Sequence, residues 1–285
     1  MPDRQRTVGR TSSELRGPAL HSGAAGSIVI GPLGPGSGLV FERADLPGRP
    51  RIPARVSNVS STRRCTALAT GCAGISTVEH VLAACFICGV DNALLVVEGN
   101  ELPAGDGSAL PFVELIESAG IVEQGAPRRT ATLDSEITAA NGGARITARP
   151  ASGPSFKFKF KGGGSLDGRE VRFVPGVTDP RDVLCARTFC FEDEIDAIRA
   201  AGMGRGGNAE NVVVLRRDGS SVNAVRCEGE PARHKLLDFI GDLSLAGVRV
   251  CAEFTAEGSG HAHNTEFARL LEERILRNGG QVVTC

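Results

Sequence analysis

The sequence lacks several features that would place the protein in particular classes. It has no Trp and no Tyr, and its net charge of −1 leaves no excess of positive charge for coating a nucleic acid. No apolar run approaches the roughly 20 residues of a membrane-spanning helix. Residues 1–6 contain no apolar segment of the kind found in an export signal. We therefore expect a cytoplasmic protein with no transmembrane segment and no nucleic-acid partner.

Lysine is also scarce, since the chain has only four Lys beside 28 Arg. Three of the four lie in the run at residues 155–161, and the fourth is Lys235. In a chain that almost always uses Arg, we single out Lys235 as a position where an ammonium group has a specific use.

The length and composition are those of a globular protein with a substantial core. With 285 residues, of which 41% are hydrophobic and 23% charged, the chain can form one large or two modest domains. Its nine cysteines are odd in number and scattered. This favours free thiols in a reducing compartment over a disulfide framework.

Strand and helix patterns occur in a similar order in the two halves of the chain. Short strands separated by Gly and Pro fill the first 60 residues, and a helix is predicted from a Ser76 N-cap to a stop at Gly89. Strands then return, including the run 155–161, where Phe and Lys alternate as in a strand with one buried face. Further helices are predicted at 193–201, 231–246 and 266–277.

The pattern lapses around residues 124–129, and we place a domain boundary there. The predicted domains are 1–126 and 127–285. Each combines strands with helices grouped on one side, which predicts a pair of α+β domains.

The helix predicted at 231–246 carries a His and two Asp on one face. His234 and Asp238 are four residues apart, so their side chains lie about 40° apart around the axis, and Asp242 extends this face. Gly241 lies between them and leaves open space. The pattern is typical of a solvated i,i+4 pair. With a third ligand from elsewhere, it is also typical of a catalytic metal site.

The pair Glu79-His80 is the candidate source of the third metal ligand. Ser76 and Glu79 form a capping-box pattern, which by itself explains an acid at this position. The alternative is a metallohydrolase pair, in which His80 binds a metal and Glu79 takes a proton from water.

Three weaker motifs also have ordinary structural explanations. Cys85 and Cys88 lie inside a predicted helix, where a buried core is favoured over zinc or redox chemistry. Residues 204–207 are favoured as a flexible turn over a phosphate loop, because no Lys-Ser/Thr follows. His261 follows glycines on a predicted loop and is an acid/base candidate, whereas His263 is favoured as a surface residue.

Seven short strings occur in order along nearly the whole chain: LHSG at 20–23, ISTVEHVLAA at 75–84, GVDN at 89–92, DGSALPF at 106–112, ARTF at 186–189, RHKLLDFIGDL at 233–243 and GHAHN at 260–264. Together they resemble the signature of the UDP-3-O-acyl-N-acetylglucosamine deacetylases, the zinc amidases of lipid A synthesis. The resemblance implies two similar two-layer domains, each a mainly antiparallel sheet with helices on one face. The helix layers pack together with the active site between them.

The resemblance also implies a metal and a set of roles. Zn²⁺ is held by His80, His234 and Asp238, with Fe²⁺ as the alternative ion in the cell. The further roles are those of general base for Glu79, oxyanion-polarising hydroxyl for Thr188, substrate-contacting cation for Lys235, electrostatic or general-acid partner for His261, and orienting acid for Asp242.

The implied substrate is a UDP-sugar that carries a fatty acyl chain. We expect the protein to be a monomer. The acyl chain lies in an apolar passage formed by Phe189 and the inserted segment 190–207. Departures from the usual family residues at Ala104, Cys190 and His263 bear on acyl-chain selectivity. Two alternatives stay open: a binding protein that keeps the fold without turnover, and an amidase for another acetylated sugar nucleotide.

Overall fold

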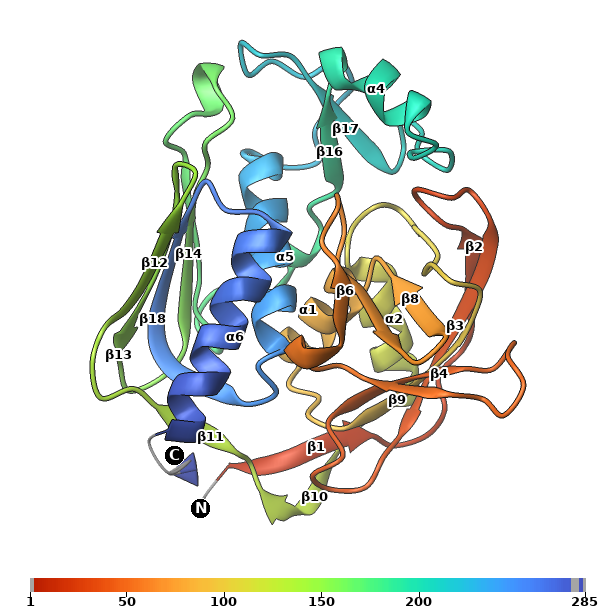
Figure 1. The fold of residues 1–285 in the computed structure, drawn as a ribbon, viewed down its shortest axis with the longest axis vertical. Coiled ribbons are helices and arrows are strands. Elements are labelled where there is room, and N and C mark those ends of the chain that lie inside the picture. Colours follow the sequence, from red (N-terminus) through yellow and green to blue (C-terminus); the bar gives the residue numbers. More distant parts are fainter. Residues whose placement is uncertain (1–2, 278–281, 284–285) are drawn as a thin grey trace.

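The two halves of the chain form two sheets that enclose two layers of helices. The structure is a computed structural model that describes residues 3–277 and 282–283. In Figure 1, the sheet of the second half is followed across the molecule by its helices, then by the helices of the first half and their sheet. The helices are α5 (Glu230–Ser244) and α6 (His261–Arg277) in the second half, and α1 (Glu79–Cys88) and α2 (Leu110–Ala119) in the first. The predicted α+β class with packed helix layers is confirmed.

The main sheet of the first half has five strands in the order β2-β3-β9-β4-β5. All neighbouring strands are antiparallel except β4 and β9. A second sheet, β6-β7-β8, leads directly into α1. The strands are β2 (Leu15–Pro18), β3 (Ala25–Pro32), β4 (Leu39–Arg43), β5 (Arg51–Pro53), β6 (Val59–Ser61), β7 (Ala67–Thr70), β8 (Ala73–Ser76) and β9 (Ala93–Glu98), with a 3-10 turn at Val56–Asn58.

The sheet of the second half has seven strands and is mainly antiparallel. Its longest strand, β18, pairs with β13 on one side, with β14 on the other, and with β11 at its start. The strands are β11 (Thr130–Thr132), β12 (Ile137–Asn141), β13 (Ala144–Pro150), β14 (Ser155–Lys159), β15 (Glu170–Phe173), β18 (Arg249–Glu257) and β19 (Val282–Val283). Phe156, Phe158 and Phe160 are buried while the intervening Lys are partly exposed, which confirms the predicted alternation.

The chain passes between the halves through a two-stranded ribbon, in which β1 (Arg4–Val8) pairs with β10 (Ile121–Pro127). The next strand, β11, already belongs to the second sheet. The domain division at 126/127 falls within this crossover and stays a prediction.

A smaller unit lies at one end of α5 (Figure 1). It contains the parallel strands β16 (Thr188–Phe191) and β17 (Val212–Leu215), with α4 (Ile195–Ala200) between them in sequence. The remaining short helices are α3 (Arg181–Leu184) and the 3-10 turns Gly164–Leu166 and Glu192–Glu194. This unit holds the segment 190–207 that was expected as an insert.

The ends of two helices bear on the site. α1 ends at Gly89, which adopts φ +79°, while the Val90 N–H donates to Cys85 O at 2.8 Å. This is the predicted glycine stop. α6 begins at His261 and not at the predicted residue 266. His261 therefore lies in the first helical turn, and the prediction that it lies on a loop is wrong.

The first seven residues of α1 are all buried, so this helix lies inside the core. Cys85 is part of that core, as predicted.

Candidate active site

The candidate site forms where α1 of the first half packs against α5 of the second half. A Cβ built at Gly241 would lie 2.1 Å from the backbone oxygen of Glu79, so only glycine allows this approach. The open space expected beside Gly241 is therefore absent, because the start of α1 fills it. The contact brings Glu79 and His80 close to the face of α5 that carries Asp238.

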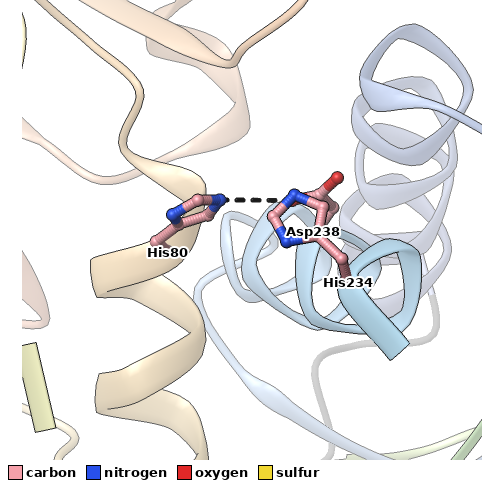
Figure 2. A group of neighbouring side chains, drawn as sticks. All are labelled: His80, His234 and Asp238. Carbon is pink, nitrogen blue, oxygen red and sulfur yellow. Dashed lines mark ion pairs between the residues drawn. The ribbon is translucent and has the colours of Figure 1, made fainter. Parts of the chain in front are cut away.

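Three buried side chains from these helices converge (Figure 2). The Nε2 atom of His80 lies 3.6 Å from Oδ1 of Asp238, and the Nε2 atom of His234 lies 3.3 Å from the same oxygen. The ligand-type atoms of all three residues lie within 4.8 Å of one another. The structure thus brings together the three residues that were predicted as metal ligands.

In this group of three side chains, two hydrogen-bond acceptors face each other: the Nε2 atom of His234 and the Oδ1 atom of Asp238. The Nδ1 atom of His234 lies 3.0 Å from the carbonyl oxygen of Ala186, which can only accept, so Nδ1 carries the proton and Nε2 the lone pair. Burial lowers the pKa of His234 to about 4, so the ring is neutral near pH 7. Among the described residues, Asp238 Oδ1 has no hydrogen-bond donor although it is buried. A lone pair facing an unpartnered carboxylate oxygen is an arrangement that a divalent cation completes.

Asp238 is ionised in spite of its burial. Burial alone would raise the pKa of this carboxyl, but His234, Lys235 and His261 hold it well below its ordinary value. The Lys235 ammonium group donates to Asp238 Oδ2 at 2.9 Å. The other oxygen, Oδ1, is the one that lies near both metal-ligand candidates.

Glu79 does not cap its helix. The N-cap position of α1 is Val78, with no side-chain cap hydrogen bond, and the Ser76 hydroxyl donates to a backbone oxygen elsewhere, at 3.1 Å. The capping-box prediction is therefore wrong. Instead, Glu79 Oε2 accepts the backbone N–H of Thr66 at 3.0 Å.

Thr66 links Glu79 to the second acid of α5. Its side-chain hydroxyl donates to Asp242 Oδ1 at 2.6 Å, and the residue is 0% exposed. The other carboxylate oxygen of Asp242 accepts from Asn264 Nδ2 at 2.9 Å and lies 2.9 Å from His261 Nδ1. Asp242 thus orients the His261 ring through Nδ1, and the Nε2 atom remains available to the site.

Two further groups of the site, His261 and Glu79, also have displaced pKa values. Burial lowers the pKa of His261, but Asp242 and Asp238 outweigh this effect and raise it to about 9, so the imidazole is charged at neutral pH. Burial raises the pKa of the Glu79 carboxyl, against the opposing effect of His261 and His80. Such displacements, in groups that lie against a potential metal centre, are typical of acid–base sites.

Comparison with known proteins identifies the family. A family model of UDP-3-O-acyl N-acetylglycosamine deacetylases matches residues 5–273. The chain belongs to this family. A UDP-3-O-acyl-N-acetylglucosamine deacetylase of Thermosynechococcus vestitus is 37% identical over 271 residues, which are 95% of this chain and 94% of that protein. Deacetylases of the same name from Pseudomonas entomophila and Geobacter sp. (strain M21) are 38% and 35% identical and cover 94% and 95% of this chain, with 90% and 89% of their own lengths matched.

In this deacetylase-family chain, Lys235 and Phe189 lie beside the three ligand candidates. The Lys235 ammonium group is 5.7 Å from the centre of the Phe189 ring, and this ring is 6.2 Å from the ring of His234. The rings of Phe160 and Phe191 also pack against Phe189, at 5.7 Å and 6.2 Å. A positive charge and a cluster of three Phe rings therefore lie beside the three ligand candidates.

Thr188 is the first residue of β16, and its backbone N–H donates to Gly107 O at 2.9 Å. No side chain or backbone group of the described residues forms a hydrogen bond with its hydroxyl. The structure shows no hydrogen bond from Thr188 to His80, His234 or Asp238, so its role at the site stays a prediction.

One supporting pair that the sequence did not reveal lies directly before Thr188. Arg187 and Glu230 are 4% and 0% exposed, and Arg187 Nε donates to Glu230 Oε1 at 2.9 Å. This buried ion pair fastens the segment that contains Ala186 to the first turn of α5. The string ARTF pointed to the segment, but nothing in the sequence indicated which acid pairs with its Arg.

A second missed feature prepares the chain for α1. Thr77 has φ +60°, a strained conformation for a β-branched residue, and its hydroxyl donates to Glu101 at 3.2 Å. Glu101 also accepts the backbone N–H groups of His21 and Ser22 at 2.7 Å and 2.8 Å. Glu101 therefore holds the LHSG loop next to the start of α1.

Within that loop, both ring nitrogens of His21 are buried without a partner among the described residues, and burial lowers the pKa of this ring.

Proposed function

We propose that the protein hydrolyses the N-acetyl group of UDP-3-O-acyl-N-acetylglucosamine, with zinc as cofactor, and releases acetate in lipid A biosynthesis. Membership of the deacetylase family supports the reaction. The observation that carries the proposal for this chain is the unpartnered Oδ1 of Asp238 beside two imidazoles, with Glu79 next to them.

The donor set fits a divalent transition metal. Two imidazole nitrogens and one carboxylate leave a position open for water or substrate, as in catalytic zinc sites, and the same set also suits Fe²⁺. When bound, zinc supplies a Lewis acid that lowers the pKa of a water molecule and polarises the carbonyl that this water attacks. We assign His80, His234 and Asp238 as the residues that hold it.

We assign Glu79 as the general base that accepts a proton from the attacking water. Its Oε2 is fixed by the Thr66 N–H, so Oε1 remains for the proton. Thr188 donates its hydroxyl to the oxyanion of the tetrahedral intermediate, a contribution of a few kcal/mol in comparable sites. His261 is protonated at neutral pH and stabilises the developing negative charge or protonates the leaving amine.

We assign the substrate to the surface beside Lys235 and Phe189. Lys235 offers a positive charge to the anionic nucleotide portion, and its side chain is 22% exposed. The rings of Phe160, Phe189 and Phe191 offer an apolar surface to the acyl chain, together with the segment 190–207.

A cytoplasmic location and a monomeric state stay part of the proposal. Seven cysteines of the described residues are free thiols, which is compatible with a reducing compartment; they are Cys65, Cys72, Cys85, Cys88, Cys185, Cys190 and Cys227. In the part of the chain that the structure describes, no helix is long and apolar enough to cross a membrane.

The proposal is tested by metal analysis together with acetate release from acylated and non-acylated UDP-N-acetylglucosamine. His234→Ala should lose tightly bound metal and activity together. His263→Ala, a His on α6 outside the ligand group, is the matched control and should keep both. A His234→Ala protein that retains one tight equivalent of zinc would contradict the ligand assignment, and activity on the non-acylated sugar alone would contradict the substrate.

A further inference from the structure

Two cysteines outside the candidate site have their sulfur atoms in contact. The Sγ atoms of Cys185 and Cys227 lie 3.9 Å apart, although the residues are 42 positions apart in the chain. Both are free thiols and both are half-buried, and we expect small oxidants to reach them. Cys185 directly follows α3, and Cys227 lies three residues before the first residue of α5.

These two thiols lie on the two segments that position His234. The residue after Cys185, Ala186, supplies the carbonyl oxygen that holds His234 Nδ1 at 3.0 Å. The buried ion pair between Arg187 and Glu230 joins the same two segments. A covalent bond between Cys185 and Cys227 would therefore form next to the Arg187–Glu230 ion pair, and it would directly affect the position of His234.

We propose that Cys185 and Cys227 form a reversible disulfide when the protein meets a peroxide, and that this disulfide lowers turnover. The effect on turnover rests on the proposed deacetylase function, whereas formation of the disulfide does not.

The chemistry needs one molecule of peroxide for each disulfide. One thiol attacks a peroxide oxygen, the O–O bond breaks, and a sulfenic acid and one water form. The second thiol attacks the sulfenic sulfur, the S–O bond breaks, and the disulfide and a second water form. The two sulfurs lose two electrons in total, and the peroxide gains them. The two sulfur atoms are in contact, so a sulfenic acid formed on either one lies next to the thiol that converts it into the disulfide.

The geometry gives the direction of the effect. A disulfide is about 2.05 Å long, so the two sulfurs must approach by roughly 1.9 Å from their distance of 3.9 Å. Part of this movement comes from rotation of the two side chains, and the rest shifts residues 185–186 relative to the start of α5. Because a misplacement of about 1 Å in a catalytic group can lower turnover about a hundredfold, we expect at least about a tenfold loss.

The test uses the full chain, loaded with metal and treated with hydrogen peroxide. Free thiols are then alkylated, the protein is digested with trypsin without reduction, and the peptides are mapped by mass spectrometry. Cleavage after Arg and Lys places Cys185 in peptide 182–187 and Cys227 in peptide 227–233, each with a single Cys. We expect these two peptides to be joined, acetate release to fall at least about tenfold, and dithiothreitol to restore both.

Variants separate this pair from the other thiols. Cys185→Ser and Cys227→Ser should each resist the peroxide-dependent loss, whereas Cys72→Ser, which removes an exposed thiol elsewhere, should respond like the unaltered chain. Absence of the joined peptides, or their presence without loss of turnover, would overturn the proposal. If the untreated protein released no acetate, the proposed function would fail, and peptide mapping would still decide whether the disulfide forms.

Discussion

The contact between α1 and α5 makes a sharp prediction for Gly241→Ala. The added Cβ would lie 2.1 Å from the backbone oxygen of Glu79 and 2.9 Å from its carbonyl carbon. An ordinary carbon–oxygen contact needs roughly 3.3 Å. The helices must therefore separate locally by about 1.2 Å, and because the obstacle is backbone, no side-chain rotation can relieve it.

Two effects of opposite sign compete in this variant. Replacing a glycine in a helix interior by alanine stabilises a protein by about 1 kcal/mol. Overpacking a filled interface costs about 1–3 kcal/mol, and a rigid obstacle places the cost in the upper part of that range. We therefore expect the free energy of unfolding to fall by about 1–2 kcal/mol. Turnover should fall further, on the order of a hundredfold, because the separation moves Glu79 and His80 away from Asp238.

The assay combines urea unfolding with acetate release by the metal-loaded protein. Gly17→Ala is the control, since a Cβ at Gly17 meets no atom within 4 Å. This control should change neither quantity appreciably. A Gly241→Ala protein that is as stable as the parent and equally active would refute the described contact and the separation derived from it.

Four further substitutions address the catalytic groups. Glu79→Gln should leave stability nearly unchanged, because no helix cap is lost, while turnover falls at least about a hundredfold with normal zinc content. Thr66→Val, which removes the hydroxyl bound to Asp242, should lower kcat about tenfold with KM little changed, and Thr66→Ser should restore most of it. Lys235→Ala should raise KM and lower turnover without releasing zinc, and zinc loss would show that its bond to Asp238 is its main role. His261 carries a raised pKa of about 9, so its proton is present at neutral pH and lost as pH rises. The rate should therefore decline on the alkaline side, at or below pH 9 because a bound cation repels the imidazolium, and an unchanged alkaline limb in His261→Gln would assign the proton elsewhere.

The sequence predicts the relative positions of those site residues that lie on one helix, α5. His234, Asp238 and Asp242 share a face of α5 because the helical period alone sets their angles, and the structure keeps them there. His80 is on the opposing helix, and no periodicity indicates which residues of two helices meet. The chemistry of the Glu-His pair made it a candidate, and the resemblance to a family placed it in the predicted ligand set.

Two wrong predictions, the capping box and the open space beside Gly241, have a common physical cause. Ser76 and Glu79 fit a capping box in sequence, but the chain enters α1 through Thr77 at φ +60° and not through an extended N-cap residue, so the hydroxyl and the carboxylate turn to other partners. The prediction of open space beside Gly241 is wrong because a sequence does not show what lies opposite a missing side chain. Both errors concern contacts made between elements.

Thr66 was missed for a related reason. One of its two contacts uses the backbone N–H, which every residue except proline possesses, and the other reaches Asp242, 176 positions further along the chain. No residue pattern records such a contact. The buried Arg187–Glu230 pair is similar, since many Arg and Glu in this chain could form it.

The raised pKa of Glu79 agrees with its assignment as a base once the charges around it are considered together. Without a cation, Asp238 and Asp242 face the charged His261 and Lys235, and burial favours the protonated form of Glu79. A divalent cation among the three ligand candidates adds positive charge beside Glu79, which favours its ionised form. We therefore expect a bound cation to lower the pKa of Glu79 and to favour the form that can accept a proton. The burial that raises its pKa also strengthens its response to the cation, because charges interact more strongly where water is excluded.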